Sequence, residues 1–291
     1  GKMRLQIDVA MCFKNEAHIL EEWINHYIDE GVDNFLLCNN NSTDNYESIL
    51  KKYDNIKLWN DRSDVVQWNC EGPRGKYGGN IYSKMISKSI ADWIIIVDSD
   101  EFVYAREGYD TIRDFLVDKG DEFNQILINS LTFHNKAPKY VTEKQPDSVI
   151  EGFVYSSPDQ KLSKSIVKRK ALIKTEIHEH VVEGRTTTGD LLQDYDMSIS
   201  TWPLNNNLEN THKGRLWRVY PKDSKVYLHC NHYRYQSKEY WFDTKCKRGY
   251  ADRVSDKVKG KSQRMKEWWN ANTLDYKKDT ELRDKKRLKQ N

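Results

Sequence analysis

The sequence lacks several features that would assign it at once to a class of protein. It has only five cysteines, an odd and scattered set, and no two of them form a Cys-x-x-Cys pair. They are Cys12, Cys38, Cys70, Cys230 and Cys246. This pattern indicates neither a zinc site nor a disulfide framework, and it predicts a reducing, cytoplasmic compartment. No apolar run approaches the roughly 20 residues that a membrane span needs, so only peripheral contact with a membrane is compatible with it.

The chain also lacks a large excess of charge. It carries 47 basic and 44 acidic residues, a net charge of +3, which does not indicate a nucleic-acid partner. Only 37% of the residues are hydrophobic, so the surface must be very polar. At 291 residues the chain is nevertheless long enough to bury a sizeable core.

What is present is a regular alternation of strand and helix patterns in the first half. Short apolar runs predict strands at residues 7–12, 35–38, 56–59 and 93–97. Apolar residues at helical spacing predict helices at 16–30, from about 44 to 52, and at about 81–90. Strands that alternate with helices indicate an α/β fold with a mostly parallel, Rossmann-like central sheet flanked by helices.

Polar residues follow three of these strands. The carboxyl ends of parallel strands meet at one edge of the sheet, where open α/β folds bind ligands. The ends of the first two strands carry Lys14, Asn15, Glu16, Asn41 and Asp44, and we expect these residues to line the base and ribose pocket of a nucleotide. The alternative for Glu16 is a carboxylate in the first turn of a helix that serves the helix dipole.

The third of these strand ends is acidic. The buried-strand pattern at 93–97 leads directly into Asp98-Ser99-Asp100, and in an extended segment Asp98 and Asp100 would point the same way. Two carboxylates on one side suit Mn²⁺ or Mg²⁺ carried by a nucleotide diphosphate, with Ser99 beside the phosphates. The alternative is a plain acidic turn.

A glycine-rich, basic segment at 71–80 precedes a predicted helix. Its backbone N–H groups could receive a pyrophosphate, with Arg74 or Lys76 adding charge and Asn80 at the end of the segment. It lacks the Gly-Lys-Ser/Thr ending of a Walker loop, and a flexible surface loop is the alternative.

The second half is less regular. Strands are predicted at 126–130, 165–168, 174–182 and 226–233, and a long loop at 138–158. In the strand 174–182, His178 and His180 would share one face and Glu179 would lie on the other. Ser237 is positioned to cap a helix that runs to about residue 248. Residues 251–291 are very rich in charge and predict a helical extension with a solvated or frayed end.

Several segments together resemble glycosyltransferase family 92 and its relatives near family 2. The resembling segments are Cys12-Phe13-Lys14-Asn15-Glu16, Leu20-Glu21-Glu22-Trp23, Gly31-Val32-Asp33, Asn41-Ser42-Thr43-Asp44, the run from Trp93 to Phe102, and the run from His232 to Tyr240. The last run has Gln236 where those relatives usually have lysine. The resemblance implies a GT-A fold over residues 1–250, with a nucleotide-sugar-binding half at 3–105 and an acceptor-binding half at 106–250. It also implies a UDP- or GDP-sugar donor and a divalent cation.

The resemblance further suggests roles for residues in the second half. A third metal ligand would be His232 first, then His180, with His229 weaker, although each could equally be a hydrogen-bonded core histidine. An inverting transfer needs a carboxylate base, for which the candidates are Glu179, Glu151 and Asp147.

Three functions therefore remain open at this point. The sequence favours a metal-dependent glycosyltransferase that moves a sugar from a nucleotide-diphosphate sugar to a glycan hydroxyl, with inversion. The alternatives are a nucleotidyltransferase that makes a nucleotide sugar, and an inactive glycan-binding module on the same fold. The intact pair Asp98 and Asp100 argues against the inactive module.

Overall fold

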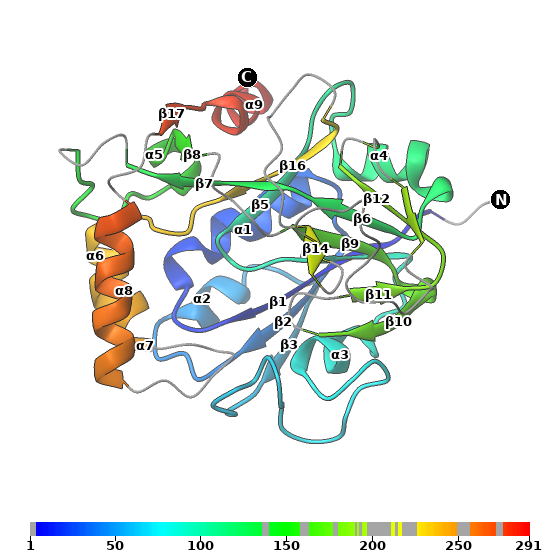
Figure 1. Cartoon of the computed structure of the whole chain (residues 1–291), viewed down its shortest axis with the longest axis horizontal. Helices are drawn as coiled ribbons and strands as arrows, with labels where there is room; N and C mark the ends of the chain where they lie inside the picture. Colours follow the sequence, from blue (N-terminus) through cyan, green and yellow to red (C-terminus); the bar gives the residue numbers. More distant parts are fainter. Residues whose placement is uncertain are drawn as a thin grey trace.

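The computed structural model (Figure 1) describes most of the chain. The described residues are 4–135, 140–157, 163–176, 180–189, 191, 194–196, 211–212, 215–216, 226–248, 257–271 and 276–291. Within them the strands form an eight-stranded sheet, a five-stranded sheet and two two-stranded pairs. Among these same residues, no helix combines the length and the apolar character needed to cross a bilayer.

The first half folds as the alternating pattern predicts. Its strands are β1 (Ile7–Phe13), β2 (Asn34–Asn39), β3 (Ile56–Asn60) and β4 (Trp93–Ile96), and its helices are α1 (Ala17–Asp29), α2 (Tyr46–Leu50) and α3 (Ile81–Ile86). The strands lie in the order β3-β2-β1-β4, and all neighbours are parallel. The chain reverses its direction of winding between β1 and β4, the position at which open α/β sheets bind ligands.

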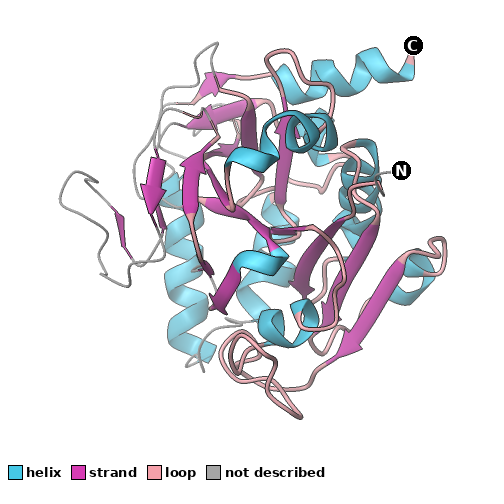
Figure 2. Ribbon diagram, turned by 90° about the vertical axis from the view of Figure 1, so that its right-hand side faces the viewer, coloured by secondary structure: helices cyan, strands magenta, loops and turns pink. Residues whose placement is uncertain are grey.

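The large sheet continues beyond β4 with strands from the second half. They are β9 (Lys164–Lys168), β6 (Gln125–Ile128), β12 (Arg185–Thr188) and β13 (Asp194–Asp196). β9 is antiparallel to β4 and β6, and β13 is antiparallel to β12, so the other six strands share one direction. Strands run through the middle of the molecule with helices around them (Figure 2). The predicted α/β class with a mostly parallel, helix-flanked sheet is confirmed.

The smaller sheet crosses the end of the large one. Its order is β17 (Lys277–Lys278), β8 (Tyr155–Ser157), β7 (Ser130–His134), β16 (Leu228–His232) and β5 (Glu101–Ala105). β5 follows β4 after only a short turn, so the turn joins the two sheets. That turn contains the acidic cluster predicted from the sequence.

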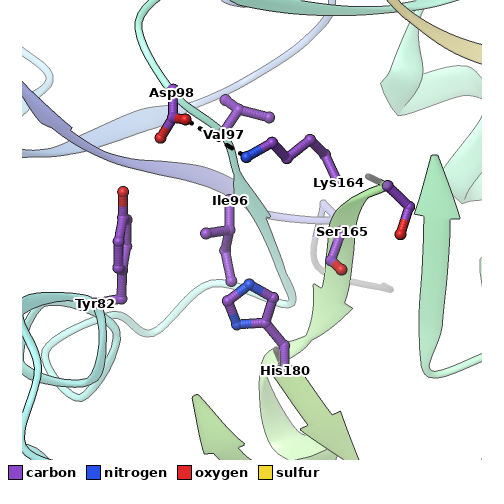
Figure 3. A pocket seen from close by; sticks show the side chains of 8 residues that line it. Tyr82, Ile96, Val97, Asp98, Lys164, Ser165 and His180 are labelled. Carbon is purple, nitrogen blue, oxygen red and sulfur yellow. Dashed lines mark hydrogen bonds and ion pairs between the residues drawn. The ribbon is translucent and has the colours of Figure 1, made fainter. Parts of the chain in front are cut away.

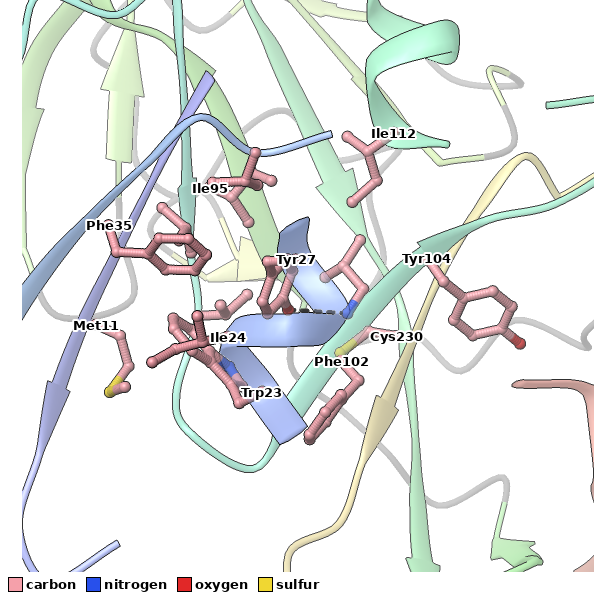
Figure 4. Packing of buried hydrophobic residues seen from close by; sticks show 14 of the residues in the cluster. Met11, Trp23, Ile24, Tyr27, Phe35, Ile95, Phe102, Tyr104, Ile112 and Cys230 are labelled. Carbon is pink, nitrogen blue, oxygen red and sulfur yellow. Dashed lines mark hydrogen bonds between the residues drawn. The ribbon is translucent and has the colours of Figure 1, made fainter. Parts of the chain in front are cut away.

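Both faces of the large sheet are buried. Val9 and Met11 of β1 face the core that contains α1, whereas Ala10 faces the core that contains α3. Figure 4 shows Trp23 and Tyr27 of α1 packed among side chains of the strands. Coverage on both faces explains why the strands read as nearly continuous apolar runs.

The remaining helices surround the second sheet and the far edge of the molecule. They are α4 (Ile112–Lys119), α5 (Val149–Gly152), α6 (Lys238–Tyr240), a π-helix (Trp241–Lys245), α7 (Cys246–Arg248), α8 (Lys257–Ala271) and α9 (Glu281–Gln290). The predicted cap of the helix at 238 is confirmed, because Ser237 Oγ accepts a hydrogen bond from the Tyr240 N–H at 2.9 Å.

Several local expectations were wrong. The predicted strand at 174–182 is instead two antiparallel strands, β10 (Leu172–Thr175) and β11 (His180–Val182), that pair with each other. The expected loop at 138–158 contains α5 and β8. Helix α3 ends before Ile90, whose side chain is 89% exposed. Helix α9 is docked rather than frayed, because the Lys285 ammonium donates to a buried carboxylate of α1.

Candidate functional site

The acidic motif forms a tight turn between the two sheets. The Glu101 N–H donates to the Asp98 carbonyl at 3.2 Å, so the segment is a turn and not the extended strand that the sequence analysis expected. Two side chains of helix α1 hold the turn by hydrogen bonds. The Trp23 indole N–H donates to the Asp98 carbonyl, and the Tyr27 hydroxyl donates to the Glu101 carbonyl at 2.7 Å. The apolar stripe of α1 thus fixes where the carboxylates point.

Three carboxylates converge at this turn. One oxygen each of Asp98, Asp100 and Glu101 lies within 4.8 Å of the others. The Asp98 side chain is 38% exposed, whereas Glu101 is fully buried. Hard oxygen donors in such a group fit Mg²⁺ or Mn²⁺. The sequence analysis identified Asp98 and Asp100 but did not name Glu101 as a donor, because its direction depends on the turn.

His232 is brought to this cluster by the smaller sheet. β16 pairs antiparallel with β5 so that His232 lies opposite Glu101, and its Nε2 is 3.2 Å from Asp100 Oδ2. Burial alone would raise the pKa of Asp100, but the His232 ring beside it, together with the charges of Lys245 and Arg234, outweighs burial and holds that pKa well below its usual range. His229 lies on the opposite face of β16 and packs against the Tyr104 ring.

A buried lysine from β9 completes the charge balance of the turn. Lys164 Nζ lies 3.0 Å from Glu101 Oε1. It also lies 3.5 Å from Asp98 Oδ2 (Figure 3). Burial would lower the pKa of Lys164, but the two carboxylates outweigh it and raise that pKa. Burial raises the pKa of Glu101 to about 7. Lys164 is not among the site residues predicted from the sequence.

Asp98 and Lys164 line a small pocket that also contains one of the predicted histidines. His180 of β11 is buried and lines the pocket with Tyr82, Asp98 and Lys164 (Figure 3). It is not part of the carboxylate group that could hold an ion. His180 is therefore close to the acidic turn, but on the side of Lys164 and not on the side of His232.

A larger cavity of about 870 Å³ lies at the ends of β1 and β2. Its lining includes four of the residues predicted to bind a nucleotide, which are Lys14, Asn15, Asn41 and Asp44. The opposite wall comes from the segment that contains the π-helix, through Asp243, Thr244, Lys247 and Arg248. The volume is in the range of ligand sites. The predicted convergence of two strand ends is thus present as a single cavity.

Local backbone geometry explains the asparagine-rich loops at this cavity. Asn15 and Asn41 have φ values of 54° and 59°, a left-handed conformation that asparagine tolerates better than most residues. Asn15 Oδ1 accepts from the Thr43 N–H at 2.7 Å, which ties the two loops together. Asp44 Oδ2 accepts from the Ala17 N–H at 2.9 Å and so holds the second loop against the start of α1.

Glu16 has a different role from the predicted ribose contact. Its buried carboxylate accepts hydrogen bonds from the Tyr240 hydroxyl at 2.8 Å and from the Arg248 guanidinium. Arg248 also donates to the Lys14 carbonyl at 2.7 Å. Glu16 therefore fastens the C-terminal wall of the cavity to the end of β1.

Three cations from the chain that follows β16 act on the acidic turn. Lys245, Arg234 and Arg248 each interact electrostatically with Asp100. Burial and the neighbouring Arg248 charge lower the pKa of Lys245 to about 8. Lys245 is the last residue of the π-helix, an uncommon conformation that is frequent at functional sites. The cavity and the acidic turn are thus joined by positive charge.

The remaining predicted residues divide between the acidic turn and other places. Asn80 caps α3 and donates to the Thr175 carbonyl at 2.7 Å, and the exposed Lys76 ammonium lies over the Tyr77 ring. Ser99 is buried in the acidic turn.

Two of the three candidate bases lie in exposed positions of the described structure. Glu151 is exposed and held by Arg287 at 2.6 Å, which lowers the pKa of its carboxyl. Asp147 is also exposed. Glu179, the first candidate, lies outside the described residues, between β10 and β11.

The family model and the curated relatives that match this chain are glycosyltransferases of family 2 and family 92. The model for glycosyl transferase family 2 matches residues 8–112. A family 92 glycosyltransferase of Ricinus communis is 22% identical over 188 residues, 63% of this chain and 33% of the relative. One of Oryza sativa subsp. japonica is 25% identical over 180 residues, 60% of this chain and 30% of the relative. The chain thus spans about a third of the length of these relatives.

Among solved structures, glucosyl-3-phosphoglycerate synthase from Mycobacterium tuberculosis is similar. It was crystallised with Mn²⁺, UDP and glucosyl-3-phosphoglycerate. It is 15% identical, with 58% of each chain covered and a TM-score of 0.32.

Proposed function

Because this chain is a family 2-like glycosyltransferase related to family 92, we propose that it transfers a sugar from a nucleotide-diphosphate sugar to a glycan hydroxyl in a cation-dependent reaction. One observation carries this proposal. The cavity at the ends of β1 and β2 and the acidic turn after β4 lie along one edge of the sheet, joined by the cations of the C-terminal wall.

The cavity would hold the nucleoside of the donor. Asn15, Asn41 and Asp44 offer amide and carboxylate groups for the base and ribose, and Lys14 and Lys247 add positive charge. Asp44 Oδ1 is buried and has no hydrogen-bond partner among the described residues, which supports a ligand there. The nucleoside end of the donor would then lie away from the acidic turn, and its diphosphate would point toward it.

The acidic turn fits the predicted divalent cation. Asp98 and Asp100 would hold it, with Glu101 and His232 beside them, and Glu101 Oε2 is a buried oxygen without a hydrogen-bond partner in the described structure. A cation bound there would supply Lewis-acid neutralisation of the departing diphosphate. Lys245, which forms no ion pair with another described residue, would add a protein charge on the same side.

A second cavity, near the residues that follow β16, supports an acceptor site. It measures about 500 Å³ and is lined by Tyr235, Gln263, Lys266, Glu267, Asn270 and Ala271. Planar amides, a carboxylate and an aromatic ring suit the hydroxyl groups and apolar faces of sugars. Arg234 links the two sides, since its guanidinium donates to Glu267 at 2.9 Å and its charge acts on Asp100.

The transfer would proceed with inversion, by direct displacement with one carboxylate as base. Glu179 remains the first candidate for this base. Because Arg287 engages the Glu151 carboxylate, Glu151 would have to leave an ion pair to accept a proton. The base would take the proton of the acceptor hydroxyl as the oxygen attacks the anomeric carbon.

A donor panel tests the proposed function. The protein is incubated with individual UDP- and GDP-sugars and Mn²⁺, with and without a mixed glycan acceptor, and the released product is measured. Release of nucleoside diphosphate with one donor supports a glycosyltransferase. In a parallel incubation with sugar phosphates and nucleoside triphosphates, release of pyrophosphate, without nucleoside diphosphate release from any nucleotide sugar, would instead assign a nucleotidyltransferase.

A further inference from the structure

Lys164 is in an unusual position for a lysine. Only 10% of its side chain is exposed, and its ammonium lies 3.0 Å from Glu101 and 3.5 Å from Asp98, two of the three carboxylates that converge at the acidic turn. It reaches the turn from β9, which pairs with β4 so that Ile96 lies opposite Ser165. The pairing of the two strands therefore sets the ammonium beside the turn.

The charges of the turn make Lys164 a competitor for any cation. Asp100 already has His232 as a partner at 3.2 Å, so the ammonium of Lys164 neutralises chiefly Asp98 and Glu101. A divalent ion that binds these carboxylates would come within a few ångströms of the ammonium, and like charges at that distance repel strongly where water is scarce. The ammonium must therefore move when the ion binds, unless another anion arrives with the ion.

We propose that Lys164 is a built-in counter-ion that keeps free divalent cations off the acidic turn until a nucleoside diphosphate supplies a new partner for its ammonium. The inference rests on the proposed donor site. A phosphate oxygen can accept a hydrogen bond from the ammonium that the carboxylates release. Cation and nucleotide then bind together, and each strengthens the other by the same factor. Lys164 is thus a positioning residue that makes the binding of the cation and the binding of the nucleotide cooperative.

Manganese binding to the whole chain tests this role without any measurement of turnover. Free Mn²⁺ is followed by electron paramagnetic resonance at pH 8 with wild-type protein, Lys164→Met and the charge-preserving Lys164→Arg. We expect Lys164→Met to bind free Mn²⁺ at least tenfold more tightly than wild type, and Lys164→Arg to stay within about threefold of wild type. Equal affinity of Lys164→Met and wild type would overturn the inference.

The cooperativity is measured in the same samples. In wild type, UDP or GDP should increase the affinity for Mn²⁺ by at least tenfold, and in Lys164→Met this increase should be several-fold smaller. The same increase in both proteins would contradict the proposed role. If wild type binds neither nucleotide with Mn²⁺ present, the proposed function fails, whereas the comparison with free Mn²⁺ still decides the role of Lys164.

A measurement on wild-type protein covers the case in which Lys164→Met does not fold. With ¹⁵N-lysine labelling, a buried and ion-paired ammonium gives a separate NMR signal. The Lys164 signal, assigned by its absence in Lys164→Arg, should shift when Mg²⁺ and a nucleoside diphosphate are added together. A signal that stays unchanged at saturation would show that the ammonium keeps its partners, and the inference would be wrong.

Discussion

At the scale of single residues, the acidic turn combines carboxylates with different surroundings. Asp98 is partly exposed, Asp100 is buried against His232, and Glu101 is fully buried against Lys164. These surroundings determine the charge that each group carries, since His232 favours the ionised form of Asp100 and burial disfavours that of Glu101. Asp100 is therefore the carboxylate whose negative charge is best secured for a cation.

Loss of Asp100 should remove cation-dependent nucleotide binding. Calorimetry of the Asp100→Ala variant with UDP and GDP is expected to show no gain in affinity when Mn²⁺ is added, because one of the two main oxygen ligands is missing. Asp54→Ala serves as the control and should behave as wild type. It removes an exposed carboxylate that lies just before β3, distant in sequence from Asp100. A normal Mn²⁺ response in Asp100→Ala would remove this residue from the cation site.

Replacement of the proposed base should affect turnover but not donor binding. Glu179→Gln keeps the size of the side chain but cannot accept the acceptor proton, so turnover should fall by ~10²-fold or more while the affinity for the donor stays the same. Glu151→Gln is the matched comparison, and its turnover should stay near that of wild type. The opposite ranking of the two variants would transfer the role to Glu151.

Two buried histidines should make stability depend on pH. Burial lowers the pKa of His26 well below its usual range and that of His134 to about 3. The unfolded chain therefore binds more protons than the folded one between about pH 6.5 and 3, and the free energy of unfolding must fall as the pH is lowered through this window. From pH 7 to 5 His134 should contribute a loss of about 2 kcal/mol, and His26 a loss in the same direction.

Urea unfolding at pH 7 and pH 5 measures this loss. His134→Gln, which cannot take up a proton, should lose less stability between the two pH values than wild type does. The same loss in the variant and in wild type would show that His134 does not titrate in this way.

At the scale of secondary-structure elements, helix α9 is fastened to the fold by ion pairs, and the pair formed by Lys285 reaches a fully buried carboxylate. The Lys285 ammonium donates to Glu30 Oε1 at 2.6 Å and to the Ala105 carbonyl at 2.7 Å. Glu30, at the end of α1, is fully buried and also accepts from the Ile112 N–H at 2.9 Å. The last helix thus neutralises a charge inside the protein.

Lys285→Met should therefore destabilise the whole domain. It leaves the Glu30 charge buried without its counter-ion, and the free energy of unfolding should fall by about 3 kcal/mol. The control is Lys289→Met in the same helix, whose exposed ammonium makes only a long contact with the Asp29 carbonyl. That variant should stay within about 0.5 kcal/mol of wild type. Equal losses in both would mean that the Lys285–Glu30 pair adds nothing specific.

Elements whose signals are local could be predicted from the sequence. The apolar stripe of α1 and the short strands β1 to β4 follow from periodicity, and Ser237 marks a cap. The hairpin of β10 and β11 could not, because its strands carry apolar residues on both sides of the connection and no glycine or proline marks the turn. Ile90 was assigned to a helix that ends earlier, since periodicity does not show where a helix stops.

The residues of the candidate site also divide into those that could be predicted from the sequence and those that could not. Asp98, Asp100 and the loops with Asn15 and Asp44 could be located, since each directly follows a strand of a parallel sheet. Lys164 could not, because its contact with the acidic turn depends on the antiparallel pairing of β9 with β4. The anchoring role of Glu16 likewise needs a partner more than 200 residues away, since Arg248 approaches it from the C-terminal wall. Sequence order carries no information about such contacts.

At the scale of the whole molecule, two cavities flank the residues that follow β16. The larger is bounded by the ends of β1 and β2, and the smaller by α8. Tyr235 of the smaller cavity follows His232 by three residues, a separation of at most roughly 10 Å along the chain. An acceptor bound in the smaller cavity would therefore lie near the acidic turn that the donor diphosphate approaches.

Substitutions can distinguish the role of the smaller cavity from that of the larger one. Gln263→Ala and Asn270→Ala should raise the KM for a glycan acceptor severalfold and leave the affinity for the nucleoside diphosphate unchanged, because both side chains line only the smaller cavity. The control is Gln290→Ala on α9, outside both cavities. A loss of nucleotide affinity in either cavity variant would argue against an acceptor site here.

The central claim is that the strand-end cavity and the acidic turn form one donor site, and a crystal structure with UDP or GDP and Mn²⁺ tests it most directly. We predict that the base lies between the Lys14–Asn15 turn and Asp44, and that the diphosphate reaches Mn²⁺ held by Asp98 and Asp100. A base more than ~6 Å from Asn15 and Asp44, beyond hydrogen-bond reach, or a diphosphate directed away from the acidic turn would contradict the account.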